Sequence, residues 1–232
     1  MTESPTSPPL SGPVEDYLKT IYDLERGAQA ATTNEIALRL DISPASVSGM
    51  VRRLADQGLI THEPYRGVRL TEDGRRAALR TLRRHRILEC YLTEVLGYPW
   101  DRVHDEAEQL EHAASEELIE RMATALGDPS HDPHGAPIPS REGEVDETAL
   151  RSLADTPVGE RVRVRQVMDK DAERLRYLAE LGIRPGAMLR IHERAPFDGP
   201  ITLGVGPSGG GVTRVIGPQL AEQVFVEPFG VE

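Results

Sequence analysis

The chain has 232 residues, a single cysteine and a formal net charge of −11 at pH 7. A chain of this length can bury a core and form two or three small domains, and a single cysteine excludes an intramolecular disulfide and fits a reducing compartment. No apolar run reaches the ~20 residues of a membrane span and residues 1–13 lack the regions of a signal peptide, so we expect a cytoplasmic protein that binds no membrane.

The first predicted element is an amphipathic helix. Residues 1–13 are rich in Ser, Thr and Pro and are expected to be a disordered tail. From Val14 to Leu24 the apolar residues follow helical spacing, and Gly27 lies just beyond the end. Two short helices are predicted next, the first capped by Thr33 and the second beginning at Pro44, where the missing N–H of proline costs little.

The segment that follows is typical of a DNA-binding unit. Val47, Val51 and Leu54 give the second short helix a buried stripe, whereas its other face carries small or basic residues that fit a groove and its phosphates. Residues 59–71 are predicted to form a β-hairpin with its turn at 65–67, which completes the helix, helix, hairpin order of a winged helix-turn-helix domain over residues 14–72. The alternative is a small α+β unit without a DNA-binding role.

Local charge supports the DNA-binding interpretation. Counting Asp, Glu, Lys and Arg, residues 1–41 carry −4, residues 42–90 carry +5, residues 91–150 carry −12 and the remainder is neutral. Phosphate binding needs a basic face, and the basic segment supplies one in an acidic chain. The residues predicted to contact DNA are Thr33, Ser43, Pro44, Ala45, Ser46, Ser48, Gly49, Arg52, Arg53 and Arg66.

Two long helices and a proline-rich loop are predicted over residues 73–140. The first helix, from about Thr71 to Leu96, has more apolar positions than one core-facing stripe needs, which indicates a helical dimer interface. The second, from about Trp100 to Leu126, is strongly acidic, and residues 128–139 then form a rigid loop with four prolines. We interpret residues 73–140 as a dimerisation and metal-binding domain.

The C-terminal part is predicted to be a small β-barrel. After a polar linker at residues 141–157, five short strands are expected within residues 158–232, around one helix from Asp171 to Leu181. The fold class is therefore mainly α with a β-hairpin wing, plus a C-terminal β-barrel.

Residues 104–112, HDEAEQLEH, indicate a metal site. On one continuous helix Glu108, Glu111 and His112 share a stripe, and His104 lies a turn earlier. Like charges at this spacing repel one another, so either solvent screens them or a cation binds there. A solvated helix face is the alternative.

Further residues in other helices favour the metal site. His85 and Glu89 form a second histidine and carboxylate pair at i, i+4, and Asp16 lies at the start of the first helix. Oxygen-rich sites with one or two imidazoles suit Mn²⁺ or Fe²⁺, whereas thiolate-rich sites suit Zn²⁺ or Cu⁺. Cys90 points away from this stripe and is expected to be a small core residue.

Six motifs resemble the diphtheria toxin repressor and manganese transport regulator family. They are VEDYLKTIYDLE, SPASVSGMVRRLADQGLI, YRGVRLTEDGRR, RRHRILECYL, VHDEAEQLEH and PHGAPIP, in family order and at family spacing. The C-terminal barrel resembles the SH3-like third domain of longer members. The resemblance implies a homodimeric repressor of metal-uptake genes whose affinity for double-stranded operator DNA depends on Mn²⁺ or Fe²⁺. It implies two metal sites per subunit and no small organic substrate.

The resemblance also implies ligand sets. One site would comprise Asp16, Glu108, Glu111 and His112, with His85 nearby. Iron-type members tend to have Met and Cys where this chain has Asp16 and Glu108. Oxygen ligands thus replace sulfur ligands, which is the change expected for a manganese site. Lys19 stands where short manganese regulators have Glu, which favours two separated sites over a closely paired two-metal centre.

The second implied site is formed by Glu89, His134 and Asp171. Asp132 stands where longer manganese-type members often have Cys, so it is a candidate for the same site, and His104 is an alternative member. Asp171 has a competing role as the N-cap of its own helix.

Other functions remain as alternatives at this point. One is an iron-dependent regulator, another is a metal-independent winged-helix repressor, and a third is a helical di-metal carboxylate enzyme or a metalloprotease. The sequence contains no HExxH motif, and its Glu-x-x-Glu-His order differs from the paired Glu-x-x-His of di-metal enzymes. We therefore predict that the chain is not an enzyme.

Overall fold

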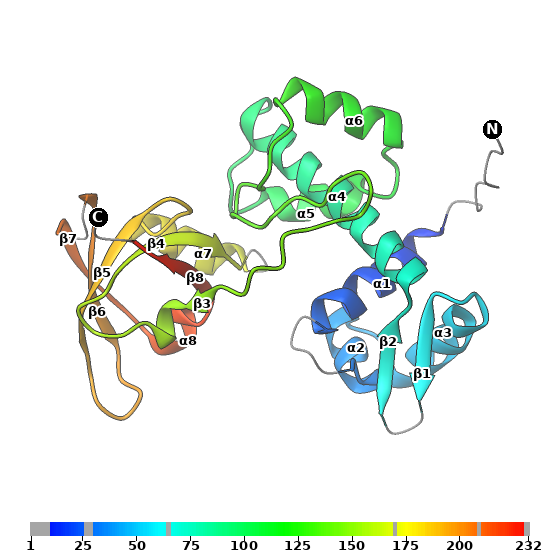
Figure 1. Ribbon diagram of the computed structural model, residues 1–232, viewed down its shortest axis with the longest axis horizontal. Coiled ribbons are helices and arrows are strands. Elements are labelled where there is room, and N and C mark those ends of the chain that lie inside the picture. Colours follow the sequence, from blue (N-terminus) through cyan, green and yellow to red (C-terminus); the bar gives the residue numbers. More distant parts are fainter. Residues whose placement is uncertain (1–9, 26–29, 64–65, 169–170, 208–209, 230–232) are drawn as a thin grey trace. The chain divides into compact units, whose positions relative to one another are not determined.

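The computed structural model describes residues 10–25, 30–63, 66–168, 171–207 and 210–229. Residues 1–9 of the predicted tail (1–13) and Tyr65 of the predicted hairpin turn lie outside the described residues, whereas Gly12 and Pro13 of that tail belong to the first helix. The chain divides into two compact units, whose helices and strands are labelled in Figure 1. The first unit contains residues 1–85, 110–115 and 139–145, and the second contains residues 86–109, 116–138 and 146–232.

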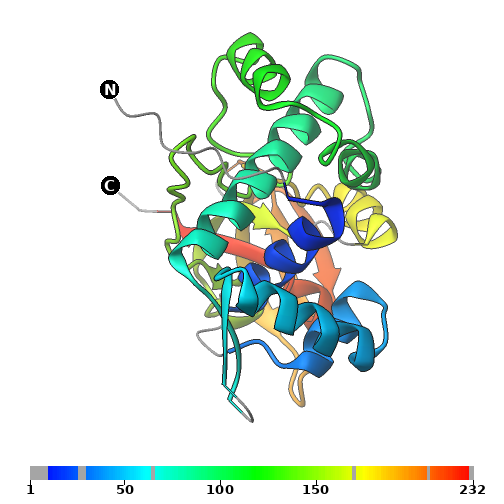
Figure 2. The ribbon, with the colours of Figure 1, turned by 90° about the vertical axis from the view of Figure 1, so that its right-hand side faces the viewer.

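The first unit has the predicted order of helix, helix, helix and hairpin. Its elements are α1 (Gly12–Glu25), α2 (Thr33–Leu40), α3 (Pro44–Asp56), β1 (Ile60–Glu63) and β2 (Gly67–Leu70). The two strands pair antiparallel, from Ile60 opposite Leu70 to Glu63 opposite Gly67, and Figure 2 shows this hairpin extending from the helices. Leu18, Ile36 and Leu54 are fully buried between the helices. The predicted winged helix-turn-helix fold is confirmed.

The helix caps follow from short-range hydrogen bonds. Thr32, rather than the predicted Thr33, is the N-cap of α2: its side chain accepts from the Glu35 N–H at 3.2 Å, and the Glu35 carboxylate accepts from the Thr32 N–H at 2.8 Å. The glutamate three residues after Thr32 completes this capping box and fixes the helix start. Pro44 begins α3 as predicted, after the N-cap Ser43.

The long helix α4 (Glu72–Glu94) is present as predicted, and it contributes residues to both units. The single helix predicted over residues 100–126 is wrong, because α5 (Val103–Leu110) and α6 (Glu116–Ala125) are separate helices. The Arg84 Nε–H donates to the Glu111 carbonyl at 3.0 Å. A continuing helix would have used that carbonyl to bind the N–H of Ser115. The side chain of Arg84 therefore competes with helix propagation at this point.

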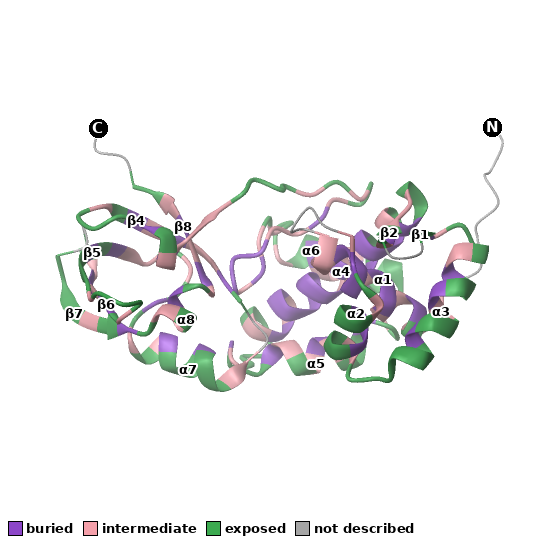
Figure 3. Ribbon diagram, turned by 90° about the horizontal axis from the view of Figure 1, so that it is seen from below, coloured by how far each residue is buried: buried purple, intermediate pink, exposed green. Residues whose placement is uncertain are grey.

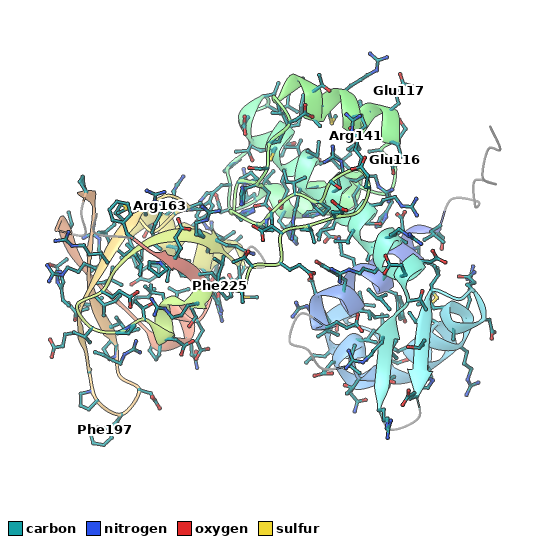
Figure 4. All side chains as sticks on the ribbon, viewed as in Figure 1. Glu116, Glu117, Arg141, Arg163, Phe197 and Phe225 are labelled. Carbon is teal, nitrogen blue, oxygen red and sulfur yellow. The ribbon has the colours of Figure 1, made fainter. Side chains whose placement is uncertain are left out.

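The second unit contains a six-stranded antiparallel sheet in the order β3-β8-β4-β5-β6-β7. Val164, Leu189, Leu203 and Val226 are buried in one hydrophobic core, and Figure 3 colours buried residues purple along the ribbon. Arg163 and Phe225 lie on neighbouring strands, and Phe197, 99% exposed, lies at the tip between β5 and β6 (Figure 4). The strands are β3 (Arg151–Ser152), β4 (Arg161–Val167), β5 (Met188–Arg194), β6 (Ile201–Val205), β7 (Val212–Ile216) and β8 (Val224–Pro228), with helices α7 (Ala172–Glu180) and α8 (Pro218–Ala221).

The five predicted C-terminal strands are all present, and a sixth was missed. Strand β3 and the 3-10 turn at Leu153–Asp155 fall within residues 141–157, which were predicted to be a linker. Leu153 is fully buried in the domain core, so the ordered C-terminal structure begins before Val158. None of the helices in the described residues combines the length and apolar character that a membrane crossing requires.

Candidate metal centres

The exposed side of α3 has the composition expected of a DNA-reading helix. The predicted stripe of Val47, Val51 and Leu54 is buried, as expected. Arg66 is exposed and pairs with Glu63 at 3.2 Å. Thr33 is partly buried, and the α3 ribbon in Figure 3 carries green, exposed segments. The other residues predicted to contact DNA are all exposed: Ser43, Pro44, Ala45, Ser46, Ser48, Gly49, Arg52 and Arg53.

A first cluster of metal-ligating side chains lies within the first unit. It contains Asp16 of α1 together with Glu111 and His112, which follow the end of α5. The Nε2 atom of His112 is 2.8 Å from Asp16 Oδ1 and 3.5 Å from Glu111 Oε1. Each residue offers a ligand atom within 4.8 Å of the others. The fold therefore brings together residues that are 96 positions apart in the sequence.

The imidazole of His112 is held between two carboxylates. Its Nδ1 is 2.7 Å from Glu15 Oε2, and Glu15 in turn accepts from Arg84 Nη2 at 2.5 Å. Burial disfavours the charged imidazole, but the hydrogen bond to Glu15 and the negative charges of Asp16, Glu111 and Glu15 outweigh it, so the pKa of His112 is raised. This chain of contacts fixes the orientation of the ring.

Glu111 is a fully buried carboxylate with two cationic or polar partners. Its Oε2 is 2.6 Å from His85 Nδ1, and its Oε1 accepts from the Lys19 ammonium at 2.7 Å. Burial alone would raise the pKa of Glu111, but the hydrogen bond with His85 and the charge of Lys19 lower it overall. The carboxylate is therefore ionised at neutral pH.

A second cluster lies within the second unit and is completely enclosed. Glu89 of α4 and the loop residues Asp132 and His134 are all buried and offer ligand atoms within 4.8 Å of one another. His134 Nδ1 is 3.7 Å from Glu89 Oε2. The opposite nitrogen of the ring, Nε2, is 2.7 Å from the carbonyl oxygen of Trp100.

The carboxylate of Asp132 binds the backbone of the proline-rich loop, which was predicted to be rigid. Asp132 Oδ1 accepts from the N–H groups of His134 and Ala136 at 2.8 and 2.9 Å, while Asp132 Oδ2 is 3.4 Å from Arg86 Nε. Gly135 has a φ of +86°, and a Cβ there would lie 1.8 Å from the Arg165 carbonyl oxygen of β4. The loop is therefore closely packed against the β domain of the same unit.

Two further predicted ligands, His104 and Glu108, also belong to the second unit. His104 Nδ1 is 3.3 Å from Glu89 Oε1, and its Nε2 is 3.7 Å from Glu108 Oε1. The prediction that Glu108, Glu111 and His112 share one helical stripe is wrong, because α5 ends at Leu110.

Asp171 caps the N-terminus of its own helix, which was the predicted alternative to metal ligation. It is the N-cap of α7, where its Oδ1 accepts from the N–H groups of Glu173 and Arg174 at 3.0 and 3.1 Å. Its Oδ2 is 2.9 Å from Arg174 Nε. Among the described residues, none of the candidate metal clusters includes Asp171.

Cys90 is a buried thiol, as expected. Its Sγ donates to the His131 carbonyl at 3.6 Å. Burial and the nearby carboxylates of Asp132, Glu94 and Glu89 raise the pKa of the thiol well above its usual value. It therefore remains protonated at neutral pH, whereas a metal-ligating cysteine is a thiolate.

Sequence reasoning missed the supporting residues Glu15, Arg84 and Trp100. Their contacts join segments far apart in the chain, such as Arg84 with Glu15 and His134 with Trp100. No local spacing signals these pairs. Glu15 could have been suspected only because it adjoins Asp16 at the start of α1.

Three protein-family models match consecutive parts of the chain. Residues 9–68 match the iron dependent repressor N-terminal DNA binding domain, residues 71–140 match the iron dependent repressor metal binding and dimerisation domain, and residues 151–228 match the FeoA domain.

Full-length relatives show the same similarity. The iron-dependent repressor IdeR of Mycobacterium tuberculosis (strain H37Rv) is 36% identical over 214 residues, which cover 87% of each chain. The diphtheria toxin repressor of Corynebacterium efficiens is 35% identical over 189 residues, covering 76% of this chain and 81% of that one.

Solved structures are similar over nearly the whole chain. A manganese-dependent transcriptional repressor in complex with manganese has a TM-score of 0.85 and 39% identity, covering 93% of this chain and all of that one. The manganese regulator SloR has a TM-score of 0.77 and 30% identity, covering 93% and 98% of the two chains. The similar proteins named here are transcription regulators rather than enzymes.

Proposed function

Because this chain belongs to the iron-dependent repressor family of metal-dependent transcription repressors, we propose that it senses Mn²⁺ and represses genes for metal uptake in the cytoplasm. Fe²⁺ is the alternative ion. The ligand chemistry supports manganese, because both clusters offer carboxylate oxygens and imidazole nitrogens. The one thiol, Cys90, is protonated and belongs to neither cluster.

We assign one ion to each of the two clusters. Asp16, Glu111 and His112 form the first proposed site, and Glu89, Asp132 and His134 form the second. His85 and His104 contact Glu111 and Glu89 respectively, so they support a ligand of each site. Glu108, which is 3.7 Å from His104 in the second unit, is assigned to neither site, and the N-cap hydrogen bonds of Asp171 favour a structural role.

The residues at both sites fit a divalent ion. Glu111 is ionised although it is buried. In the second site, the contact of His134 Nε2 with the Trp100 carbonyl requires that Nε2 carries a proton, so the neutral ring has its lone pair on Nδ1, on the side of Glu89. Metal-bound histidines usually donate their second N–H to a carbonyl or a carboxylate in this way.

The observation that carries the proposal is the contact between Asp16 and His112. Asp16 belongs to the first helix of the DNA-binding fold, whereas His112 follows α5, and their side chains meet at 2.8 Å. When bound, the ion supplies the positive charge that holds the carboxylates of Asp16 and Glu111 together. Asp16 then fixes α1, and α1 packs against α2 in the same core as α3.

Fixing α1 affects DNA binding through the symmetry of a dimer. Two recognition helices of a helix-turn-helix dimer must lie about 34 Å apart to enter successive major grooves. We propose that metal binding to Asp16, Glu111 and His112 shifts an existing conformational equilibrium toward this arrangement. The shift cannot exceed the difference between the binding free energies of the ion for the ordered and the less ordered state. The matched dimerisation model and the exposed Val95 and Leu96, which directly follow α4, support a homodimer.

An anaerobic DNA-binding titration tests this function. Fluorescence anisotropy of labelled promoter DNA would be measured in chelator and with increasing Mn²⁺, Fe²⁺ or Zn²⁺. We expect tight binding only with metal and the largest response at physiological Mn²⁺ concentrations. Equal DNA affinity in chelator and in Mn²⁺ would contradict the proposal. A response to Fe²⁺ alone would identify iron, rather than manganese, as the ion that the protein senses.

A further inference from the structure

Lys19 places an ammonium group inside the first candidate metal site. Its Nζ lies 2.7 Å from Glu111 Oε1, and the side chains of Lys19 and Glu111 are 13% and 0% exposed. His85 Nδ1 lies 2.6 Å from the other oxygen, Oε2. Both oxygens of this buried carboxylate are therefore engaged, one of them by a full positive charge.

The oxygen that Lys19 binds also faces the other two residues of the cluster. Glu111 Oε1 is 3.5 Å from His112 Nε2, and that nitrogen is 2.8 Å from Asp16 Oδ1. A divalent ion that takes Glu111 as a ligand would thus share this carboxylate with the ammonium of Lys19. Full charges at such short separations interact strongly when they are shielded from bulk water.

We propose that Lys19 acts as a resident cation that sets the metal affinity of the site. The inference rests on the proposed function, because it takes Asp16, Glu111 and His112 as the ligand set. In the metal-free protein Lys19 compensates the charge of Glu111, so the apo state is stabilised. In the metal-bound protein the same ammonium repels the ion. Both effects raise the metal concentration that is needed to occupy the site.

A purely structural salt bridge between α1 and the turn after α5 makes the opposite prediction. Removing such a bridge would loosen the arrangement of Asp16 and Glu111 and weaken metal binding. Removing a resident cation leaves Glu111 without its charged partner in the apo protein, so binding of a divalent ion gains free energy. The sign of the change in metal affinity therefore separates the two roles.

Three substitutions at Lys19 and one control resolve the contribution of charge. Lys19→Met removes the charge and the donor, Lys19→Gln keeps a hydrogen-bond donor without charge, and Lys19→Arg keeps the charge. Arg39→Met is the matched control, because it removes a cation of the same unit that pairs with Asp23 at 3.7 Å, away from the cluster. Mn²⁺ affinity of the full-length chain would be measured by electron paramagnetic resonance of free Mn²⁺, without DNA.

We expect Lys19→Met and Lys19→Gln to bind Mn²⁺ at this site about tenfold more tightly or better. Lys19→Arg should stay within about twofold of the wild type, and Arg39→Met should not change. The melting temperature gives a second readout: both neutral variants should be less stable without metal, and Mn²⁺ should raise their melting temperature by more than it raises that of the wild type.

Unchanged or weaker Mn²⁺ affinity in folded Lys19→Gln would overturn the inference, and this comparison decides the matter even where Lys19→Met fails to fold. Failure of the proposed function is recognised separately. In that case the wild type and Asp16→Asn would bind Mn²⁺ with the same affinity and stoichiometry, whatever the Lys19 variants do.

Discussion

The Nε2–H of His134 donates a 2.7 Å hydrogen bond to the carbonyl oxygen of Trp100, and the two rings stack with their centroids 5.5 Å apart. The indole of Trp100 is itself covered by the guanidinium of Arg184, 4.9 Å from the ring centroid. These contacts fix the tautomer and the orientation of the imidazole, so that Nδ1 lies on the side of Glu89. A ligand of the proposed second site is thus oriented before any metal binds.

Replacing His134 should remove one metal ion per subunit. His134→Ala deletes a nitrogen ligand of the second proposed site, so the stoichiometry of tightly bound Mn²⁺ should fall from two to one per chain in equilibrium dialysis with metal analysis. His131→Ala is the matched control, because His131 contacts Ser130 and Arg165 rather than the cluster. Identical metal content in the two variants would contradict the assignment.

Asp16→Asn should uncouple DNA binding from metal. The amide keeps the size of the side chain but loses the charge, so the metal-dependent gain in DNA affinity should fall by at least tenfold in the anisotropy titration. Asp23→Asn, in the same helix, is the control and should respond to Mn²⁺ like the wild type. A wild-type response of Asp16→Asn would exclude Asp16 as a ligand.

The metal-free protein should lose the stabilising contribution of His112 as the pH rises. The pKa of His112 is raised in the folded state, chiefly by the hydrogen bond to Glu15 and the charge of Asp16 against the opposing effect of burial. Its contribution is therefore complete below the unfolded pKa of about 6.5 and disappears as the pH passes through the folded pKa. Melting temperatures in chelator, measured at increasing pH from below about 6.5, should show the wild type losing its advantage over His112→Gln as the pH rises. A constant difference across this range would refute the charged pairing.

Arg52 and Arg53 should contribute to DNA binding mainly through phosphate contacts. Both are exposed on α3, and replacing either by alanine should reduce the slope of log affinity against log salt by about 1. Arg121→Ala on α6, where Arg121 pairs with Glu117 at 2.8 Å, is the control and should keep the wild-type slope. Unchanged slopes for both α3 variants would argue against α3 as the DNA-reading helix.

Gly135→Ala should disrupt the second site by displacing the loop. A Cβ at residue 135 would lie 1.8 Å from the Arg165 carbonyl oxygen, and the φ of +86° is itself unfavourable for alanine. Gly127→Ala separates the two effects, because its φ is +77° but no atom lies within 4 Å of the added Cβ. Denaturant unfolding should show a loss of about 1–2 kcal/mol for Gly127→Ala and a larger loss, with lower Mn²⁺ content, for Gly135→Ala. Equal losses would show that the loop can move away from β4.

Local patterns were sufficient to predict most of the fold. The buried stripe of α3, the hairpin and the C-terminal strands follow from apolar periodicity and turn residues, which depend only on neighbours in the sequence. The acidic helix was mispredicted because α5 ends at Leu110, and Arg84 of a different element binds the Glu111 carbonyl that a continuous helix would have used. A contact between residues 27 positions apart cannot be recognised from helical spacing.

The candidate sites were predicted only in part for the same reason. The residue types of the ligands were visible, but their grouping depended on where α5 ends. Glu108 is placed in one unit and Glu111 in the other, although they are three residues apart. Glu15, Lys19 and Trp100 act on the ligands through tertiary contacts that no spacing rule describes.

Anomalous diffraction from crystals grown with Mn²⁺ tests the central claim most directly. The account predicts a manganese peak within bonding distance of Asp16, Glu111 and His112, with the ammonium of Lys19 adjacent to Glu111. The absence of a peak at these residues, in crystals of a protein that still binds its DNA in a Mn²⁺-dependent manner, would contradict it.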